Sequence, residues 1–348
     1  MNIFIRFLSA TIFLFLSFIA DNTLGQCAYN GRQENASTFT IGCSNQAWQV
    51  GSGAFQRFTV TSGVVYDFNT CGSTYDTQIT GFNSGGAVVG LYNDDNASGN
   101  NACGGGVQSG VNWTATFSGE LRVQLNTYNC TNWPGGGSAT LNYRIAPPTT
   151  STNGGNQTVC QSVASSGLGG NTPSIGTGTW TANSGNVSFS NVNTPNATAT
   201  ASAGGSYALT WTINNGVCTS ASSLTLTVNS NSTNPTGISG SSAYCTGDAA
   251  VTLTATGGTE GAGVNSGAGY QWYAGSCGGG SVLGTGNSIA VSPGSTTSYF
   301  VRRNGTCNQT SCFSTTVTVK TPSVAPTGIT GTTTICSCLL YTSPSPRD

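Results

Sequence analysis

A two-residue alternation of apolar and polar side chains in residues 66–103 constrains the fold more than any other feature. Tyr66 and Phe68 alternate with Val65 and Asp67, which is the period of a strand with one buried face. Two further strands are expected over 77–82 and 87–92. Between them lies the sequence Asn-Ser-Gly-Gly, a turn signal because glycine adopts positive φ without steric cost. The stretch therefore predicts a β-meander, and no helical period competes with it.

Composition excludes several functional classes. The chain has 348 residues, of which 36% are hydrophobic, enough for two or three domains of ordinary size. Charged residues make up 5% and the net charge is -1, so no basic patch is available to bind nucleic acid. Histidine is absent and lysine occurs once, at Lys320. This excludes Ser-His-Asp and Cys-His catalysis as well as histidine-ligated metals.

Residues 1–25 are typical of a secretory signal peptide. Arg6 precedes the apolar run 7–20, and small residues stand at the −3 and −1 positions of a cut before Gln26. A lipoprotein signal ending at Cys27 is the alternative, which Gln26 directly before that cysteine disfavours. No later segment has the length and hydropathy of a transmembrane helix. We therefore expect a secreted or cell-surface protein.

Export makes the 13 cysteines candidates for disulfides rather than metal ligands. The sequence Cys336-Ser337-Cys338 lacks the spacing of a zinc site. Cys71 and Cys103 stand in loops at the two ends of the expected meander, where a disulfide would close it. Five cysteines precede residue 131, so one of them is expected to stay unpaired or to bond elsewhere.

The first module spans residues 26–146. Alternating apolar positions continue through three more segments, near 113–117, 121–125 and 141–145, which predicts an antiparallel sandwich or jelly roll. The sequences DTQI at 76–79, NDD at 93–95 and VNWTATFSGELRVQLNTYNC at 111–130 resemble the pre-peptidase C-terminal type of bacterial β-domain. The resemblance implies a non-catalytic module, with calcium, matrix or glycan ligands among the possibilities.

A calcium site is expected at the acidic residues of this module. Asp94 and Asp95 are adjacent in a tight turn, and Asp76 starts a neighbouring strand. Close carboxylates repel each other, and a hard cation relieves that repulsion. Asn93 and Asn96 could add amide oxygens. The alternative is that the aspartates only cap turns.

A proline-rich linker, 147–152, leads to a second module at 153–230, which contains no Asp, Glu, Lys or Arg. Cys160, Trp180 and Cys218 follow the Cys, Trp, Cys order of an immunoglobulin-like sandwich, which implies a Cys160–Cys218 disulfide. The sequences GTGTWTANSG and YALTWTINNGVC resemble the PKD-like or immunoglobulin-like repeats of large bacterial surface proteins.

The third module, residues 231–321, contains YQWYAGSCGGG and TTSYFVRRNGTCNQTSC. These sequences resemble the immunoglobulin-like repeat of giant adhesins of gliding bacteria. Tyr270 and Trp272 are interpreted as core residues rather than as a stacking platform, and Arg302-Arg303 as a solvated pair. Four cysteines allow three connectivities, of which we favour the following: Cys277–Cys307 with Cys245–Cys312.

A repeat begins at the end of the third module. The motif Pro-Thr-Gly-Ile occurs at 235–238 and again at 326–329, an offset of 91 residues (326 − 235). Residues 322–336 are thus expected to begin a second copy. The tail 337–348 matches neither the repeat nor the composition, and it resembles translated sequencing-adapter read-through. The chain is therefore expected to be the N-terminal part of a longer surface protein.

The expected function is non-catalytic adhesion or interaction through tandem β-sandwiches, with an extracellular glycan or protein as partner. The alternative is the non-catalytic binding region of a secreted hydrolase. A glycosidase pair is conceivable only among the carboxylates of the first module, and turn or metal roles explain the aspartates better. These carboxylates are Glu34, Asp67, Asp76, Asp94, Asp95 and Glu120.

Overall fold

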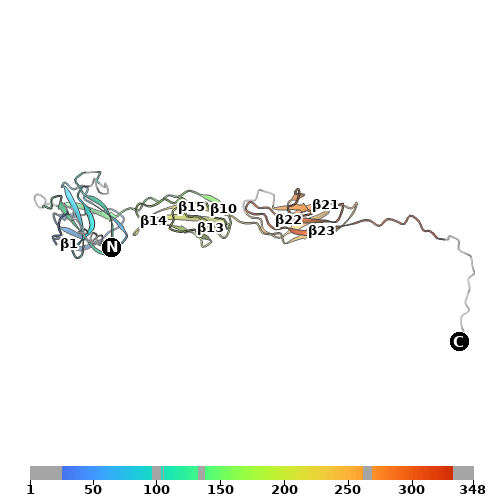
Figure 1. Ribbon diagram of the computed structural model, residues 1–348, viewed down its shortest axis with the longest axis horizontal. Coiled ribbons are helices and arrows are strands. Elements are labelled where there is room, and N and C mark those ends of the chain that lie inside the picture. The colour runs from blue at the N-terminus through green and yellow to red at the C-terminus, as the bar shows by residue number, and fades with distance from the viewer. Residues whose placement is uncertain (1–25, 96–102, 105, 132–137, 262–268, 332–348) are drawn as a thin grey trace, which may run out of the picture. The chain divides into compact units, whose positions relative to one another are not determined.

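The computed structural model describes residues 26–95, 103–104, 106–131, 138–261 and 269–331. These residues form strands and no helix (Figure 1), which confirms the all-β prediction. They divide into two compact units, Met1–Val228 and Asn229–Asp348. Within the described ranges no helix has the length and hydropathy needed to cross a membrane. The predicted signal peptide at 1–25 and the tail at 337–348 lie outside the described residues.

The first module is a sandwich of two sheets. The five-stranded sheet has the order β1 (Gln33–Thr40), β3 (Phe55–Val60), β8 (Gly119–Thr127), β5 (Thr77–Asn83) and β6 (Val88–Asn93). The four-stranded sheet has the order β2 (Gln46–Gly51), β9 (Ser138–Ile145), β4 (Val65–Asn69) and β7 (Gly110–Thr114). Phe58, Phe68 and Leu141 are fully buried in the core between the two sheets. The alternation of apolar residues thus predicts which side chains face the core.

Two expectations for this module are wrong. The strands near 66, 77 and 87 do not form a meander, because β4 belongs to the four-stranded sheet and the β5–β6 hairpin to the other. The sandwich is also not purely antiparallel, since β1 pairs with β3 in parallel. Both errors have one cause: alternation identifies a strand and its buried face, but contains no information about the sheet or the direction of its partner.

The second module is built on the sheet β10 (Gln157–Cys160), β15 (Cys218–Asn229), β14 (Gly205–Asn215) and β11 (Thr177–Ala182). A second, two-stranded sheet contains β12 (Val187–Phe189) and β13 (Ala199–Ala201). Trp180 and Trp211 pair across β11 and β14 and are buried. The expected linker does not behave as a spacer: Ser151 is buried, its N–H donates to Ser220 Oγ at 2.9 Å, and its hydroxyl donates to the carbonyl of Trp211 at 2.7 Å.

The turn after β14 joins the second module to the first. The Asn215 side chain is 2% exposed. Its amide donates to the carbonyl oxygens of Val65 at 2.9 Å and Ala146 at 2.7 Å, and its Oδ1 accepts from the N–H of Val65 at 2.9 Å. Gly216 follows at φ +61°, where a Cβ would lie 3.2 Å from Val64. These contacts make the two modules one compact unit.

The third module contains a three-stranded sheet and a five-stranded sheet. The first has the order β16 (Gly237–Ser239), β18 (Val251–Thr256) and β21 (Ser288–Val291). The second has the order β17 (Ala243–Cys245), β23 (Phe313–Lys320), β22 (Thr297–Arg303), β19 (Tyr270–Ala274) and β20 (Gly284–Thr285). Trp272 is fully buried, as expected of a core residue.

The arginine pair at the end of β22 is not a solvated surface pair, contrary to expectation. Arg303 lies over the ring of Tyr270 at 3.8 Å from its centroid, and Arg302 lies over Tyr273 at 5.0 Å. Both arginines are half-buried. Neighbouring positions of a strand face opposite sides of the sheet, so each guanidinium covers a different tyrosine.

Candidate functional site

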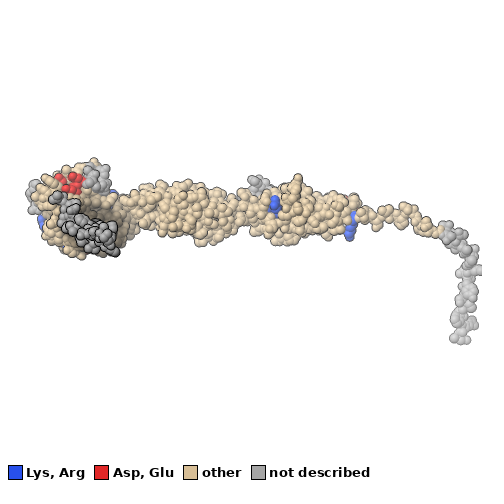
Figure 2. Space-filling view, viewed as in Figure 1, with Lys and Arg blue, Asp and Glu red and all other residues tan. Residues whose placement is uncertain are grey.

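The β5–β6 hairpin brings the predicted acidic residues to one end of the first module. Asp76 immediately precedes β5, and Asp94 and Asp95 follow β6. The two strands are antiparallel, with Ile79 opposite Asn93. The start of one strand therefore lies beside the end of the other, which brings together three residues that the sequence separates. Acidic side chains gather in one patch on the visible face of this part of the chain (Figure 2).

The pKa values of Asp76 and Asp94 are raised, first by burial and then by neighbouring carboxylates. Burial raises the pKa of Asp76 above its ordinary value, and the charges of Asp95 and Asp94 raise it further. Burial also raises the pKa of Asp94, a hydrogen bond with Gln78 opposes this, and Asp95 adds to it. One carboxylate oxygen of each, Oδ1 of Asp76 and Oδ1 of Asp94, is buried with no hydrogen-bond partner within the described residues. Negative charge here is therefore incompletely compensated.

The buried hydroxyl group of Ser109 supports the segment that contains Asp94 and Asp95, here called the acidic turn. Ser109 Oγ lies within hydrogen-bonding distance of the carbonyl oxygens of Thr77, Asn93 (3.0 Å) and Asp94 (3.1 Å). The N–H of Gly110 donates to Asn93 Oδ1 at 2.7 Å. The Asn93 Oδ1 is therefore already used by the start of β7, which leaves it less available for its predicted role as a cation ligand.

The donor set fits a hard cation only in part. Carboxylate and carbonyl oxygens are the ligands that calcium prefers, and two buried carboxylate oxygens without partners are present. Across the described ranges, however, no three acidic, histidine or cysteine side chains are arranged to hold a metal ion. Asn96, the other expected amide ligand, lies outside the described residues.

The disulfide of this loop region joins the expected partners. Cys71 bonds to Cys103 with 5.1 Å between the Cα atoms. Thr70, next to Cys71, lies 2.6 Å from Thr77 between hydroxyl oxygens, and Thr70 Oγ1 accepts from the N–H of Ser109 at 2.9 Å. The loop after β4 is therefore held by the disulfide at Cys71 and by the hydrogen bond between Thr70 and Ser109.

The predicted Cys160–Cys218 disulfide is wrong, because Cys218 bonds to Cys43 of the first module. Ser151 contacts Ser220, and the side chain of Asn156 accepts from the N–H of Thr225. The chain thus runs along β15 in the same direction, and Cys160 lies toward its far end. The two ends of this 12-residue strand are about 35 Å apart, far beyond the reach of a disulfide. Cys43 is the odd cysteine that was expected to bond elsewhere.

The favoured pairing in the third module is also wrong. Cys277 bonds to Cys312, which excludes both Cys277–Cys307 and Cys245–Cys312. Cys245 lies opposite Lys320 at one end of β23, whereas Cys312 precedes the other end, about 25 Å away along the strand. Among the described cysteines, Cys245 is the free thiol.

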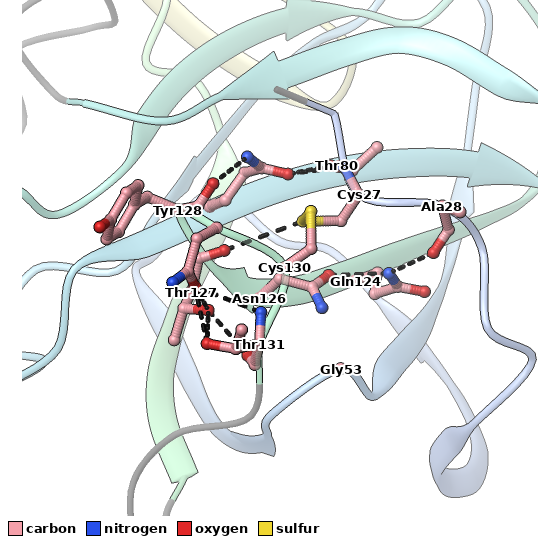
Figure 3. Close-up of a disulfide and its surroundings, with 12 residues drawn as sticks. Cys27, Ala28, Gly53, Thr80, Gln124, Asn126, Thr127, Tyr128, Cys130 and Thr131 are labelled. Carbon is pink, nitrogen blue, oxygen red and sulfur yellow. Dashed lines mark hydrogen bonds between the residues drawn. A yellow bond between two sulfur atoms is a disulfide. The ribbon is translucent and has the colours of Figure 1, made fainter. Parts of the chain in front are cut away.

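A short strap at the start of the described chain was missed by sequence reasoning. Cys27 bonds to Cys130, and its N–H donates to the buried Gln78 at 2.8 Å. Figure 3 shows Gln124 directed toward Ala28, whose carbonyl accepts from its amide at 3.1 Å. Two glutamines with no exposed surface are thus satisfied by backbone groups of the strap. In the sequence, the one indication of this strap is that Cys27 requires a partner for a disulfide.

The third module matches a known family. Residues 233–326 match the sequence model of the family described as "Ig-like domain CHU_C associated". This supports the immunoglobulin-like prediction for 231–321, and the match ends at Pro326, where the second Pro-Thr-Gly-Ile motif begins. The resemblances of the first two modules remain predictions. No curated protein matches the chain.

Several solved structures are similar in part. Domains A168–A170 of titin share 11% identity over 80% of this chain and 100% of theirs, with a TM-score of 0.30. The N-terminal four Ig domains of Dscam1 isoform 6.9 share 12% identity over 79% of this chain and 73% of theirs, with a TM-score of 0.28. The fibronectin(III)-like modules of Clostridium thermocellum CbhA share 13% identity over 49% of this chain and 95% of theirs, with a TM-score of 0.25. These likenesses assign no function.

Proposed function

We propose that the chain is a secreted or cell-surface, non-catalytic adhesion protein whose β-sandwich modules present binding surfaces to an extracellular ligand. The observation that best supports this is the combination of disulfide-braced sandwiches with a segment that matches an immunoglobulin-like family. Disulfides and sandwich modules suit a protein that must keep its binding surfaces intact outside the cell.

The state of the remaining carboxylates supports the non-catalytic part of the proposal. Asp67 pairs with Arg144 at 2.9 Å, and Glu120 pairs with Arg122 at 2.7 Å. A glycosidase needs one carboxylic acid with a raised pKa beside a second free carboxylate. Two of the candidate carboxylates are instead paired with arginine.

The experiment is an adhesion assay with beads that display the chain. We expect beads with wild-type protein to be retained on immobilised extracellular polysaccharides or matrix proteins, and beads with reduced, alkylated protein to be washed off, because the modules lose their disulfides. The alternative, a binding region of a secreted hydrolase, predicts retention on the polymer that the hydrolase degrades. Release of soluble sugar or peptide by the chain itself would contradict the non-catalytic proposal, as would a lack of retention on every polymer.

As a second proposal, the acidic turn of the first module binds calcium. Its support is the pair of buried, unpartnered oxygens of Asp76 and Asp94, together with the burial and the neighbouring negative charge that raise their pKa values. The remaining ligands would be backbone carbonyls and water. Such an incomplete set of side-chain ligands suits the affinity of extracellular modules, about 10⁻⁴–10⁻³ M.

A further inference from the structure

The indole of Trp48 is exposed in a protein that buries its other described tryptophans. Trp48 is 39% exposed, whereas the remaining ones are almost fully buried, namely Trp113, Trp180, Trp211 and Trp272. Trp48 lies on β2, the edge strand of the four-stranded sheet. Isolated exposed apolar residues are common, so the surroundings of the indole decide whether it has a use.

Trp48 forms part of a groove between the edges of the two sheets. The groove has a volume of about 410 Å³ and is lined by Glu34 of β1 and by Ala47, Trp48 and Gln49 of β2. The ring of Phe39 contacts the indole edge-on, with 5.0 Å between centroids and 76° between planes. This aromatic contact holds the indole in place while part of its surface faces solvent.

The polar side chains of the groove are held in place by hydrogen bonds but retain unused donors and acceptors. Glu34 Oε2 accepts from the N–H of Gly51 at 2.9 Å, and its second oxygen is available to another donor. The Gln49 amide donates to Thr140 Oγ1 at 2.8 Å and its Oε1 accepts from Ser138 Oγ at 3.2 Å. An amide can donate two hydrogen bonds and its oxygen can accept two, so one of each remains.

We propose that this groove binds a neutral saccharide, with a pyranose ring stacked on Trp48 and a hydroxyl bonded to Glu34. A sugar ring combines an apolar C–H face with hydroxyls that donate and accept at its rim, which matches an indole beside a carboxylate. A hydroxyl donating to a carboxylate forms a charge-assisted hydrogen bond. The same carboxylate disfavours acidic sugars. This inference rests on the proposed adhesion function and names its ligand class.

An added peptide strand fits the groove less well. Strand addition needs a run of free backbone N–H and C=O groups along an edge. On β2 the N–H of Gly51 is already occupied by the Glu34 carboxylate, which reaches across from β1. The edge that a peptide would use is therefore occupied at the end of β2, three residues after Trp48, whereas a saccharide requires no such continuous edge.

The test measures binding of cellotetraose, laminaritetraose and chitotetraose to the full chain by saturation-transfer NMR, with tetragalacturonate as the acidic comparison. We expect at least one neutral tetrasaccharide to bind and tetragalacturonate to bind more weakly. Trp48→Ala should weaken binding about tenfold, and Trp48→Phe less, because a smaller ring retains part of the stack. Glu34→Gln should weaken it about fivefold. Phe313→Ala, which removes an aromatic ring of the third module with the same 39% exposure, should leave binding unchanged.

Glu34→Gln keeps the proposal testable if the Trp48 variants fail to fold, and circular dichroism identifies that failure. Equal binding by the wild type, Glu34→Gln and folded Trp48→Ala would overturn the proposal, as would no binding of any neutral tetrasaccharide at about 10 mM. An effect of Trp48→Ala on bead adhesion to a protein but not to polysaccharides would favour a peptide ligand and also overturn it. If beads carrying Trp48→Ala adhere as wild-type beads do, the saccharide site fails while the adhesion function stands.

Discussion

At the scale of single residues, the second module depends on one aromatic cluster. Trp180 packs against Trp211 at 5.3 Å and Phe189 at 6.3 Å between ring centroids, and its Nε1–H donates to the carbonyl of Pro195 at 3.0 Å. A module without ion pairs has few other sources of stability. The indole therefore combines the burial of a large apolar surface with a satisfied polar group.

Trp180→Ala should lower the free energy of unfolding of this module by about 3–5 kcal/mol, because it removes a fully buried ring and leaves a cavity. Urea unfolding followed by circular dichroism measures the change. Thr181→Ala, an exposed neighbour on the same strand, is the control and should change stability little. Unchanged stability of Trp180→Ala combined with a loss of ligand binding would show that the indole is a surface platform instead.

The calcium proposal is tested at the same scale. A ligand that binds only the folded state, at 10 mM and with the affinity expected above, stabilises it by about 1–3 kcal/mol. The melting temperature of the wild type should therefore rise in calcium relative to chelator, and Asp94→Asn should lose most of the rise. Asp248→Asn, an exposed aspartate of the third module, should respond as the wild type does. Identical wild-type melting curves in calcium and in chelator would refute the site.

The raised pKa values of Asp76 and Asp94 predict a pH dependence without calcium. The folded state holds these protons more tightly than the unfolded state, so the free energy of unfolding increases as pH falls through the raised pKa values. This contribution is complete below the ordinary value of 3.8. The measurement is the difference in the free energy of unfolding between wild type and Asp94→Asn, taken in chelator from pH 7 to pH 4. This difference cancels the contributions of titratable groups elsewhere in the chain. A difference in stability that does not change with pH would contradict the prediction.

At the scale of elements, the start of β15 and the turn before it hold the first two modules together. Cys218 begins β15 and bonds to Cys43, while Asn215 binds backbone groups of Val65 and Ala146. The side chain of Asn215 therefore lies between the two modules, next to the Cys43–Cys218 disulfide, and we call this turn the Asn215 wedge. Removal of the Asn215 side chain would break three hydrogen bonds to backbone groups, of which the Val65 carbonyl would still accept from the N–H of Ala146 at 2.9 Å.

The double variant Cys43→Ser, Cys218→Ser should separate the unfolding of the first two modules. The disulfide spans 175 residues of sequence, and a loop of that size corresponds to about 5 kcal/mol in the loop-entropy model. Calorimetry should show one transition for both modules in the wild type and two in the variant. Cys71→Ser, Cys103→Ser breaks a disulfide within one module and should lower stability without splitting the transition. Separate wild-type transitions for the first and the second module, in addition to the transition of the other unit, would argue against the wedge.

At the scale of the whole molecule, the chain comprises two units with separate cores. The core of the second unit is formed by residues of its own strands, with Trp272 and Val301 fully buried. The Cys277–Cys312 disulfide also lies within this unit. Each unit therefore has the apolar contacts needed for a cooperative transition of its own.

We expect two calorimetric transitions in the full chain, one for each unit. Trp272→Ala should shift only the transition of the unit that contains the third module, and Trp180→Ala only the other, because each indole is buried in a different core. Intrinsic tryptophan fluorescence collected alongside assigns the transitions. A shift of both transitions by either variant would show that the units unfold as one.

The sequence by itself determined the local structure and the buried residues. Period-two alternation predicted strands and the faces they bury, as at Tyr66, Phe68 and Trp272, because strand geometry sends neighbouring side chains to opposite sides. It also predicted the Cys71–Cys103 pair and the grouping of the three aspartates, since these lie within a few turns of one another along the chain. The period of the side chains and the short distance along the chain were sufficient for these predictions.

Only the tertiary structure decided which distant elements meet. The Cys43–Cys218 bond, the Asn215 wedge and the stacking of Arg303 on Tyr270 depend on sheet order, strand direction and module packing. A strand pattern is the same whether its neighbour is parallel or antiparallel, and whichever sheet it joins. Cys160 illustrates this: its place in the sequence matched an immunoglobulin-like pattern, but the direction of the chain beside β15 placed it a strand length from Cys218.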